Sequence, residues 1–134
     1  MNLKQLSGQT AEAMAALALV REGFDVCIPC FHQPAFDLIS KWGRVIHAIQ
    51  VKSGTVGPNA KTIQWRTRPY KGLYSEGDCS YFGLVLIPHN EIWWIPYNVL
   101  KGKRSVCTNI ESDSWAEYRG NTNGLKKCQQ ICQR

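Results

Sequence analysis

The sequence predicts an α/β (or α+β) fold in which a helix precedes a mixed central β-sheet flanked by helices. Residues 11–22 form an alanine- and leucine-rich run, and alanine and leucine are the strongest helix formers. Residues 81–87 are continuously apolar, which is typical of a strand buried on both faces of a sheet. The length of 134 residues fits one domain over residues 1–134, with a more polar C-terminal extension from about residue 101.

The predicted first helix has clear start and stop signals. Ser7 or Thr10 can cap its N-terminus, because a side-chain oxygen there accepts a backbone N–H that has no partner within the helix. Gly23 ends it, since glycine adopts the left-handed conformation at little cost. The helix is apolar nearly all round, so we expect it to pack closely on the sheet.

Short β-branched and apolar segments predict the strands. They span residues 24–28, 36–40, 45–53, 62–67, 81–87 and 91–95, and a short helix is expected from Pro96 to Leu100. Gly43 predicts a tight turn that joins the second and third strands as an antiparallel hairpin, and residues 54–61 and 68–78 read as loops. Trp115 and Tyr118 indicate that the C-terminal segment docks onto the rest of the chain.

The formal net charge of +6 favours a polyanionic partner, although a basic protein without such a partner has the same composition. The sequence holds no apolar stretch long enough to span a membrane, and its N-terminus lacks the apolar core of a secretory signal. We therefore expect no membrane partner and a cytoplasmic, nucleoid-associated protein.

The six cysteines are expected to be reduced thiols, because no secretory signal is apparent. Cys27 and Cys30 have a CxxC spacing and Cys128 and Cys132 a CxxxC spacing, so together they offer a zinc site. The favoured alternative is that they are small buried hydrophobic residues, because the first pair lies in the apolar run 26–31.

Three polar features interrupt apolar elements and suggest a catalytic site. Asp37 lies on an apolar strand, and Gln50 and Lys52 share one face of the next strand, since side chains two apart point the same way. The hairpin places Asp37 opposite that pair. Glu12 shares a side of the helix with Ala15, which should face the sheet. Two carboxylates and an amide oxygen then converge beside one lysine.

That convergence suits metal-dependent hydrolysis of a phosphodiester. Mg²⁺, with Mn²⁺ as an alternative, prefers oxygen ligands, which Asp37, Gln50, Glu12 and the backbone carbonyl of Val51 can supply. Lys52 can orient or activate water or neutralise charge in the transition state. Taken singly, these residues fit turn capping, an exposed strand face or a charge near a helix end. Their order and spacing favour the catalytic interpretation.

The ordered segments GQTAEAMAALALVREGFDVCIPC, AFDLI and IQVKSG resemble the PD-(D/E)XK nuclease superfamily. They are most similar to its group I intron homing endonucleases and archaeal-type Holliday-junction resolvases. The matching positions are Gly8, Ala11, Glu12, Gly23, Phe24, Asp37, Gln50, Lys52 and Ser53. The resemblance implies a restriction-endonuclease-like core and a DNA endonuclease whose catalytic residues are Glu12, Asp37, Gln50 and Lys52. It departs from the usual pattern at Phe36, where a proline is common, and at Gln50, where an acid is common.

The resemblance implies double-stranded or branched DNA as substrate and a homodimer or homotetramer that cuts both strands. We expect a homing-type endonuclease; the alternatives are a Holliday-junction resolvase and an inactive DNA-binding module with the same fold. The candidate DNA contacts follow the predicted catalytic strand and include a basic, aromatic run, although a solvated surface fits that run equally well. They are Lys52, Ser53, Lys61, Gln64, Arg66, Arg68 and Lys71.

Overall fold

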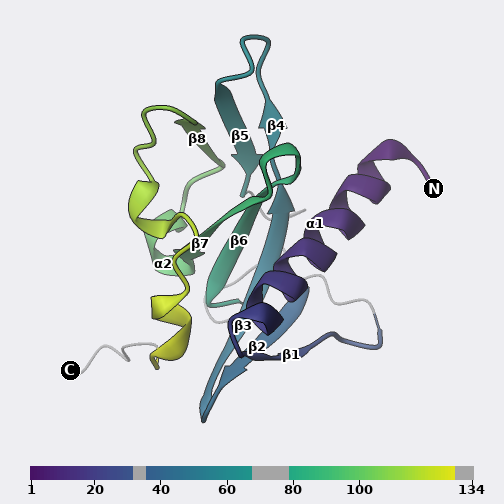
Figure 1. The fold of residues 1–134 in the computed structure, drawn as a ribbon, viewed down its shortest axis with the longest axis vertical. Coiled ribbons are helices and arrows are strands. Elements are labelled where there is room, and N and C mark those ends of the chain that lie inside the picture. The colour runs from purple at the N-terminus through teal and green to yellow at the C-terminus, as the bar shows by residue number, and fades with distance from the viewer. Residues whose placement is uncertain (32–35, 68–78, 129–134) are drawn as a thin grey trace.

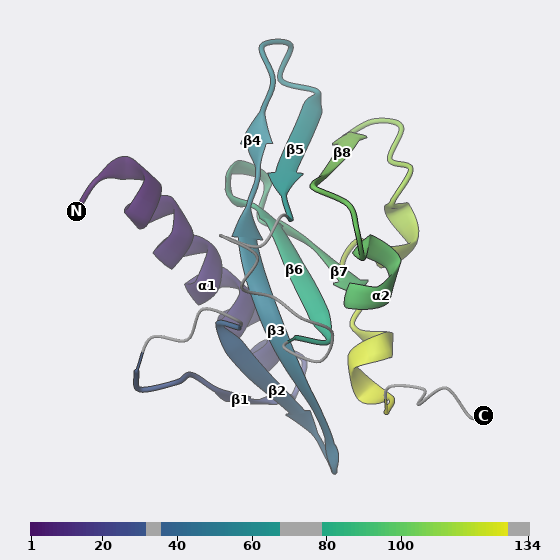
Figure 2. The same cartoon turned by 180° about the vertical axis from the view of Figure 1, so that it is seen from behind.

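The computed structural model describes residues 1–31, 36–67 and 79–128. In Figures 1 and 2, a long helix crosses one face of a mixed sheet, and a smaller sheet stands at one end of it. This arrangement confirms the predicted α/β class with a mixed central sheet. None of the described helices is long and apolar enough to cross a membrane.

The larger sheet has five strands in the order β1-β2-β3-β6-β7. These strands are β1 (Asp25–Cys27), β2 (Leu38–Trp42), β3 (Val45–Ser53), β6 (Tyr81–Leu86) and β7 (Glu91–Pro96). The β3–β6 pair is parallel and the other pairs are antiparallel. Every residue of β6 is buried, as its apolar run predicted, because core side chains cover both faces of this central strand.

Helix α1 (Leu3–Arg21) begins earlier than expected. Asn2 is the N-cap, and it forms a capping box in which its side chain accepts from the Gln5 backbone while Gln5 Oε1 accepts from the Asn2 N–H. The prediction of a cap at Ser7 or Thr10 was wrong, since both residues lie inside the helix. Asn-x-x-Gln at the chain start satisfies two backbone N–H groups at once, which fixes the helix start at that point.

Only one stripe of α1 is fully buried. Ala11, Ala15 and Leu19 are four residues apart and pack against the sheet, where the small alanines allow a close approach. The helix does pack closely on the sheet, as predicted, although Leu17 and Val20 are about half exposed. The physical reason is that the sheet covers a single side of the helix.

The strand bounds differ from the predicted ones mainly at their ends. β1 is shorter than expected, β2 is shifted by two residues toward the C-terminus, and β3 has the predicted bounds. Gly43 forms the expected turn between β2 and β3, with a φ of 60° that glycine tolerates without strain. The short helix after Pro96 is α2 (Tyr97–Leu100).

The smaller sheet consists of β4 (Thr55–Val56), β5 (Thr62–Arg66) and β8 (Ser105–Asn109), in that order. β4 lies within the predicted loop at 54–61, and that part of the prediction was wrong. β8 lies in the polar C-terminal segment and pairs with β5 over five residues. Neither strand has a continuous apolar signal, because β4 is exposed and β8 presents alternate side chains to water.

Gly54 connects the two sheets. Its N–H donates to Val85 O at 2.9 Å, and the indole Nε1 of Trp65 donates to the same oxygen at 3.0 Å. A Cβ at Gly54 would lie 2.5 Å from Trp65 Nε1, so only glycine allows the buried indole to pack here. The orientation of the smaller sheet is therefore set by a tight contact at the end of β3.

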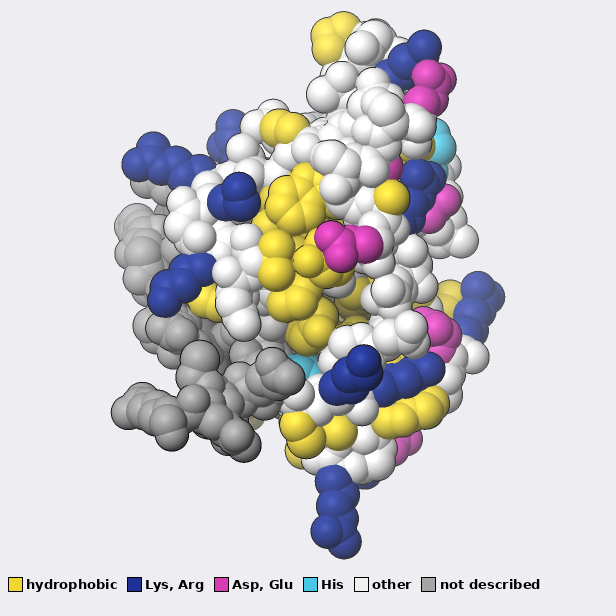
Figure 3. All heavy atoms as spheres, turned by 90° about the vertical axis from the view of Figure 1, so that its left-hand side faces the viewer, with side chains coloured by type: hydrophobic (Ala, Val, Ile, Leu, Met, Phe, Trp, Pro, Cys, Tyr) yellow, Lys and Arg dark blue, Asp and Glu magenta, His cyan; other side chains and the backbone are white. Residues whose placement is uncertain are grey.

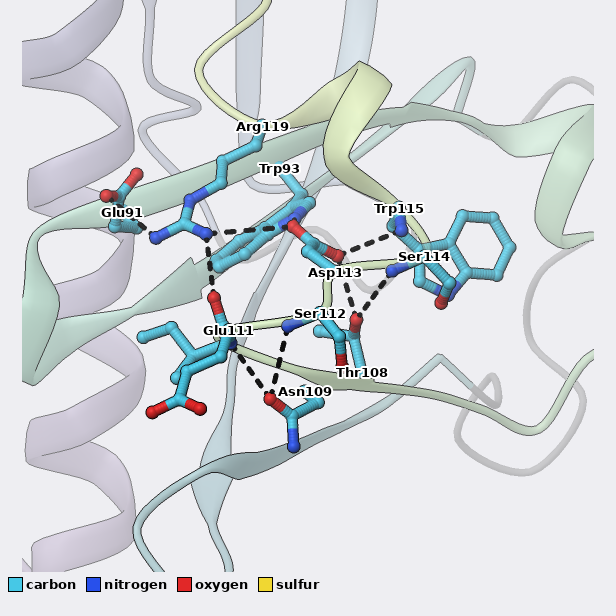
Figure 4. Close-up of polar contacts among 11 residues, drawn as sticks. Glu91, Trp93, Thr108, Asn109, Glu111, Ser112, Asp113, Ser114, Trp115 and Arg119 are labelled. Carbon is cyan, nitrogen blue, oxygen red and sulfur yellow. Dashed lines mark hydrogen bonds and ion pairs between the residues drawn. The ribbon is translucent and has the colours of Figure 1, made fainter.

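The C-terminal segment is fastened to β7 by a buried carboxylate (Figure 4). Asp113 accepts from Trp93 Nε1 at 2.7 Å, from Thr108 Oγ1 at 2.8 Å and from the Trp115 N–H at 2.9 Å. Arg119 lies over the Trp93 ring and pairs with Glu91 at 3.0 Å, as Figure 4 shows.

Two short 3₁₀ helices complete this segment, η3 (Ala116–Tyr118) and η4 (Asn123–Lys126); a third, η2 (Ile87–His89), joins β6 to β7. Trp115 and Tyr118 pack against the core, as their sequence positions predicted. On this side of the molecule, Figure 3 shows a strip of hydrophobic side chains with lysine and arginine side chains around it. The C-terminal segment is thus an integrated layer of the fold.

Candidate active site

Asp37 lies immediately before β2 and is fixed against β3. Its backbone N–H donates to Ile49 O at 2.8 Å, and its Oδ2 accepts from the Val51 N–H at 2.7 Å. The side chain thus takes the place of a strand partner for Val51, at the point where the pairing of β2 with β3 stops. The predicted hairpin does bring Asp37 beside the middle of β3, and its carboxylate is held in one orientation.

Gln50 and Lys52 lie on the face of β3 that points away from α1. Ile49 and Val51 pack with the helix in one apolar cluster, whereas the β6 partners of Gln50 and Lys52 belong to the cluster on the other face. The prediction that Gln50 and Lys52 share a face agrees with this register. Asp37, just before β2, is the residue that interacts with Glu12 of α1 and also influences Lys52 through its charge.

Glu12 comes to Asp37 from the middle of α1. The pKa of Glu12 rises to about 7, because burial disfavours its charge and because it hydrogen-bonds to Asp37 and is repelled by that carboxylate. Two carboxyl groups this close hold a proton between them near neutral pH. A cation of higher charge can replace that proton, so the pair is suited to a divalent metal.

Gln50 supplies a third oxygen that the described protein leaves unsatisfied. The side chain is 7% exposed, and its Oε1 is buried without a hydrogen-bond partner in residues 1–31, 36–67 and 79–128. A buried acceptor without a partner costs about 1 to 3 kcal/mol, so such an atom calls for a ligand. An amide oxygen, like a carboxylate oxygen, is a ligand of the kind that Mg²⁺ prefers.

Lys52 is half-buried, and this burial lowers the pKa of its amine. The charges of Asp37 and Cys79 oppose that change, and Lys4 adds to it. A lysine whose pKa is lowered gives up its proton more readily, which suits a group that accepts or relays a proton. Lys52 thus lies within electrostatic reach of the proposed metal ligands.

Cys79 was not singled out from the sequence as a neighbour of the site. It is buried at the start of β6, and its charge affects the pKa of Lys52. Its proximity depends on β6 lying parallel to β3, a pairing that joins residues about 30 apart in the chain. His47, in contrast, is buried between Ser80 Oγ at 2.9 Å and Lys127 O at 2.7 Å, which indicates a structural role on the opposite face of β3 from Gln50.

The structure tests the predictions made for the cysteines. Cys27 and Cys30 are exposed, so their interpretation as buried hydrophobic residues was wrong; β1 is an edge strand that ends before Cys30. Within the described part of the chain, no group of three or more His, Cys, Asp or Glu side chains is arranged to hold a metal. The site at Asp37 is of another kind, since two of its proposed ligands are an amide and a backbone carbonyl.

The predicted DNA contacts are spread along the end of β3 and the smaller sheet. Ser53 ends β3, and Gln64 and Arg66 are exposed on alternate positions of β5. Lys61 precedes β5 and forms an exposed ion pair with Glu111 at 3.5 Å. The remaining predicted contacts, Arg68 and Lys71, lie outside the described residues.

Comparison with known proteins supports the fold and the family of the chain. No curated protein matches the sequence. Among solved structures, that of the bacterial homing endonuclease I-Ssp6803I is similar, with a TM-score of 0.80 and 17% identity, covering 94% of this chain and 93% of that one. This similarity confirms the restriction-endonuclease-like fold. The profile of the PD-(D/E)XK endonuclease family matches residues 1–116, and the chain therefore belongs to that family.

Proposed function

We propose that the protein is an Mg²⁺-dependent DNA endonuclease of the homing type, with Mn²⁺ as an alternative metal. The observation that carries the proposal is the buried Oε1 of Gln50, which has no hydrogen-bond partner in the described chain; Gln50 is next to Val51, whose N–H donates to the Asp37 carboxylate of the Glu12–Asp37 pair. A buried oxygen without a hydrogen-bond partner is costly unless a ligand such as a cation satisfies it. Mg²⁺ also neutralises phosphate charge and lowers the pKa of a bound water.

Each residue of the site has a distinct proposed role. Asp37, held by the Val51 N–H, presents a fixed carboxylate, and Glu12 adds a second one from α1. Gln50 and the carbonyl of Val51 are the neutral oxygen ligands. Lys52 orients or activates the attacking water, for which its lowered pKa is suited, or in its protonated form stabilises charge on the phosphoryl group.

The proposed substrate, DNA, rests on the similar solved structure and on the net charge of the chain. The similar solved structure is described as a bacterial homing endonuclease, and the net charge of +6 favours a phosphate backbone. Cutting both strands of a duplex calls for two active sites, so we propose a homodimer or homotetramer. A Holliday-junction resolvase and an inactive DNA-binding module are the outcomes that the following experiment separates from this proposal.

The test is a cleavage assay on supercoiled plasmid, intron-less host-gene DNA and a four-way junction, with Mg²⁺, with Mn²⁺ and with chelator. We expect wild-type protein to cut linear or plasmid duplex at a defined position only with metal, and Asp37→Ala and Lys52→Ala to lose that cleavage. Asp25→Ala is the matched control, because Asp25 is an exposed acid on β1 paired only loosely with Lys41 at 3.9 Å.

Preferential cutting of the junction would replace the homing type by a resolvase. Tight DNA binding without metal-dependent cutting of any substrate would favour the inactive module. Cleavage that survives in Asp37→Ala at the level of Asp25→Ala would refute the assignment of the site.

A further inference from the structure

The outer face of the β5–β8 ribbon has a consistent composition. Alternate residues of each strand point outward, and the register pairs the outward ones with each other: Thr62 with Asn109, Gln64 with Cys107, and Arg66 with Ser105. β4 adds Thr55, which pairs with Gln64. The face thus holds hydrogen-bonding side chains and one cation, with no carboxylate among its outward residues, while Trp65 and the other inward side chains pack in the core.

We infer that this face enters the major groove of a DNA duplex and reads base pairs next to the cut, with Gln64 as the central reading residue. The inference rests on the proposed function and goes beyond it by assigning the recognition surface. The major groove is about 12 Å wide, and the three strands at Gln64, about 4.8 Å apart, measure roughly 10 Å across. Gln64 at the centre of the face offers a donor and an acceptor, the combination that pairs with adenine in that groove.

The position of the face relative to the active site supports this assignment. β3 carries Gln50 and Lys52 and runs through Gly54 directly into β4, as Figures 1 and 2 show. Thr55, the β4 partner of Gln64, is three residues beyond Lys52 in the chain, which corresponds to roughly 10 Å along a strand. That length spans about three base pairs, at about 3.4 Å of helix axis for each.

The junction between the two sheets is stiff. Trp65 is 1% exposed, contacts Gly54 tightly and donates to Val85 O at 3.0 Å. The outward side chains of β5 therefore keep a fixed distance from Lys52. A reading surface needs such rigidity, because the base contacts must agree in register with the phosphate that is cut.

The opposing charges at the Thr62–Asn109 end of the β5–β8 ribbon also fit a DNA partner. Lys61 pairs with Glu111, and both side chains are more than half exposed, so the pair contributes little in water. A DNA phosphate can therefore replace Glu111 as the partner of Lys61 at a small cost in free energy. This residue would place the ribbon on the backbone, whereas Gln64 and Arg66 face the bases.

The first test uses the thiol of Cys107, which lies opposite Gln64 and is exposed. The protein is treated with a maleimide in Ca²⁺ buffer of low ionic strength, alone and with sonicated plasmid DNA, and labelling is read by peptide mass spectrometry. We expect DNA to slow labelling of Cys107 and to leave Cys128 unchanged, because Cys128 follows η4, which packs against β2 and β3 of the larger sheet. Equal labelling of Cys107 with bound DNA would overturn the inference and leave the proposed nuclease intact.

The second test uses a duplex that the wild-type protein cuts, varied one base pair at a time. For wild-type protein and for Asn98→Ala, an exposed control on α2, substitutions within about three base pairs of the cut should reduce cleavage roughly ten- to a hundredfold. In Gln64→Ala we expect that discrimination to vanish at one of these positions and to persist elsewhere. Unchanged discrimination at every position would refute the reading role, while absence of both cutting and DNA binding would refute the proposed function and this inference together.

Discussion

Glu12→Gln is the variant whose effect on the metal-free protein follows most directly from the geometry. The pKa of Glu12 is raised from 4.5 to about 7 in the folded chain, first by burial and then by Asp37. That difference corresponds to about 3.4 kcal/mol, at about 1.36 kcal/mol for each pKa unit. Because Glu12 is partly exposed, water screens its charge, and we expect about 1 to 2 kcal/mol.

The sign of the pH dependence follows from proton binding. Between pH 4.5 and about 7 the folded chain holds a proton that the unfolded chain has lost, so this carboxyl makes the fold less stable as pH rises. Below pH 4.5 both states are protonated and the cost is absent; above pH 7 the cost is complete. The amide that replaces the carboxyl in Glu12→Gln cannot ionise, so the substitution removes the cost at high pH only.

The assay is urea unfolding with chelator present at pH 5 and pH 8. We expect Glu12→Gln to be about as stable as wild type at pH 5 and about 1 to 2 kcal/mol more stable at pH 8. Glu117→Gln, an exposed glutamate on η3, gives the baseline for the same chemical change. Saturating Mg²⁺ should reduce the advantage of the variant at pH 8, because the metal stabilises the wild-type pair. A stability difference that is equal at the two pH values would refute the reasoning.

Three further predictions concern the junction, the ligand set and the C-terminal segment. Gly54→Ala should destabilise the fold by about 1 to 3 kcal/mol in urea unfolding, because its Cβ would lie 2.5 Å from the fixed Trp65 indole; an unchanged midpoint would show that Trp65 can move. Gln50→Glu should bind Mn²⁺ roughly tenfold more tightly in calorimetry, because it adds a ligand charge, and weaker binding would argue against Gln50 as a ligand. Asp113→Ala should lower the free energy of unfolding by about 1 to 3 kcal/mol, because it leaves the buried Trp93 Nε1 without its acceptor, and an unchanged free energy of unfolding would contradict a fastening role.

The main elements of the fold were accessible from local patterns. β3 had its predicted bounds, and β6 was predicted within one residue, because β-branched and continuous apolar runs are strong signals. Strands β4 and β8 were not predicted, because their sequence signals are weak. β4 has only two residues, and β8 alternates buried and exposed positions in a polar segment, so their pairing with β5 is visible only in three dimensions.

The candidate site was predicted as a set of residues that converge, but its detailed geometry was not foreseen. Asp37, Gln50 and Lys52 follow from strand alternation and a hairpin, and Glu12 from helix periodicity. The pairing of β2 with β3 stops at Leu38, and this leaves the Val51 N–H free to hold the Asp37 carboxylate. Sequence patterns do not show where the pairing of two strands stops, so they could not predict that the Val51 N–H is free to bind Asp37.

The sequence by itself determined the class of the fold and the family, and it suggested the residues of the proposed metal site, since propensity, periodicity and motif spacing are properties of neighbouring positions. The tertiary structure alone decided that α1 covers one face of β3 while Gln50 and Lys52 point to the other. It also decided that Cys79 lies near Lys52 and that the polar C-terminal segment completes a second sheet. These features depend on contacts between residues far apart in the chain. Such contacts form only when the whole core packs.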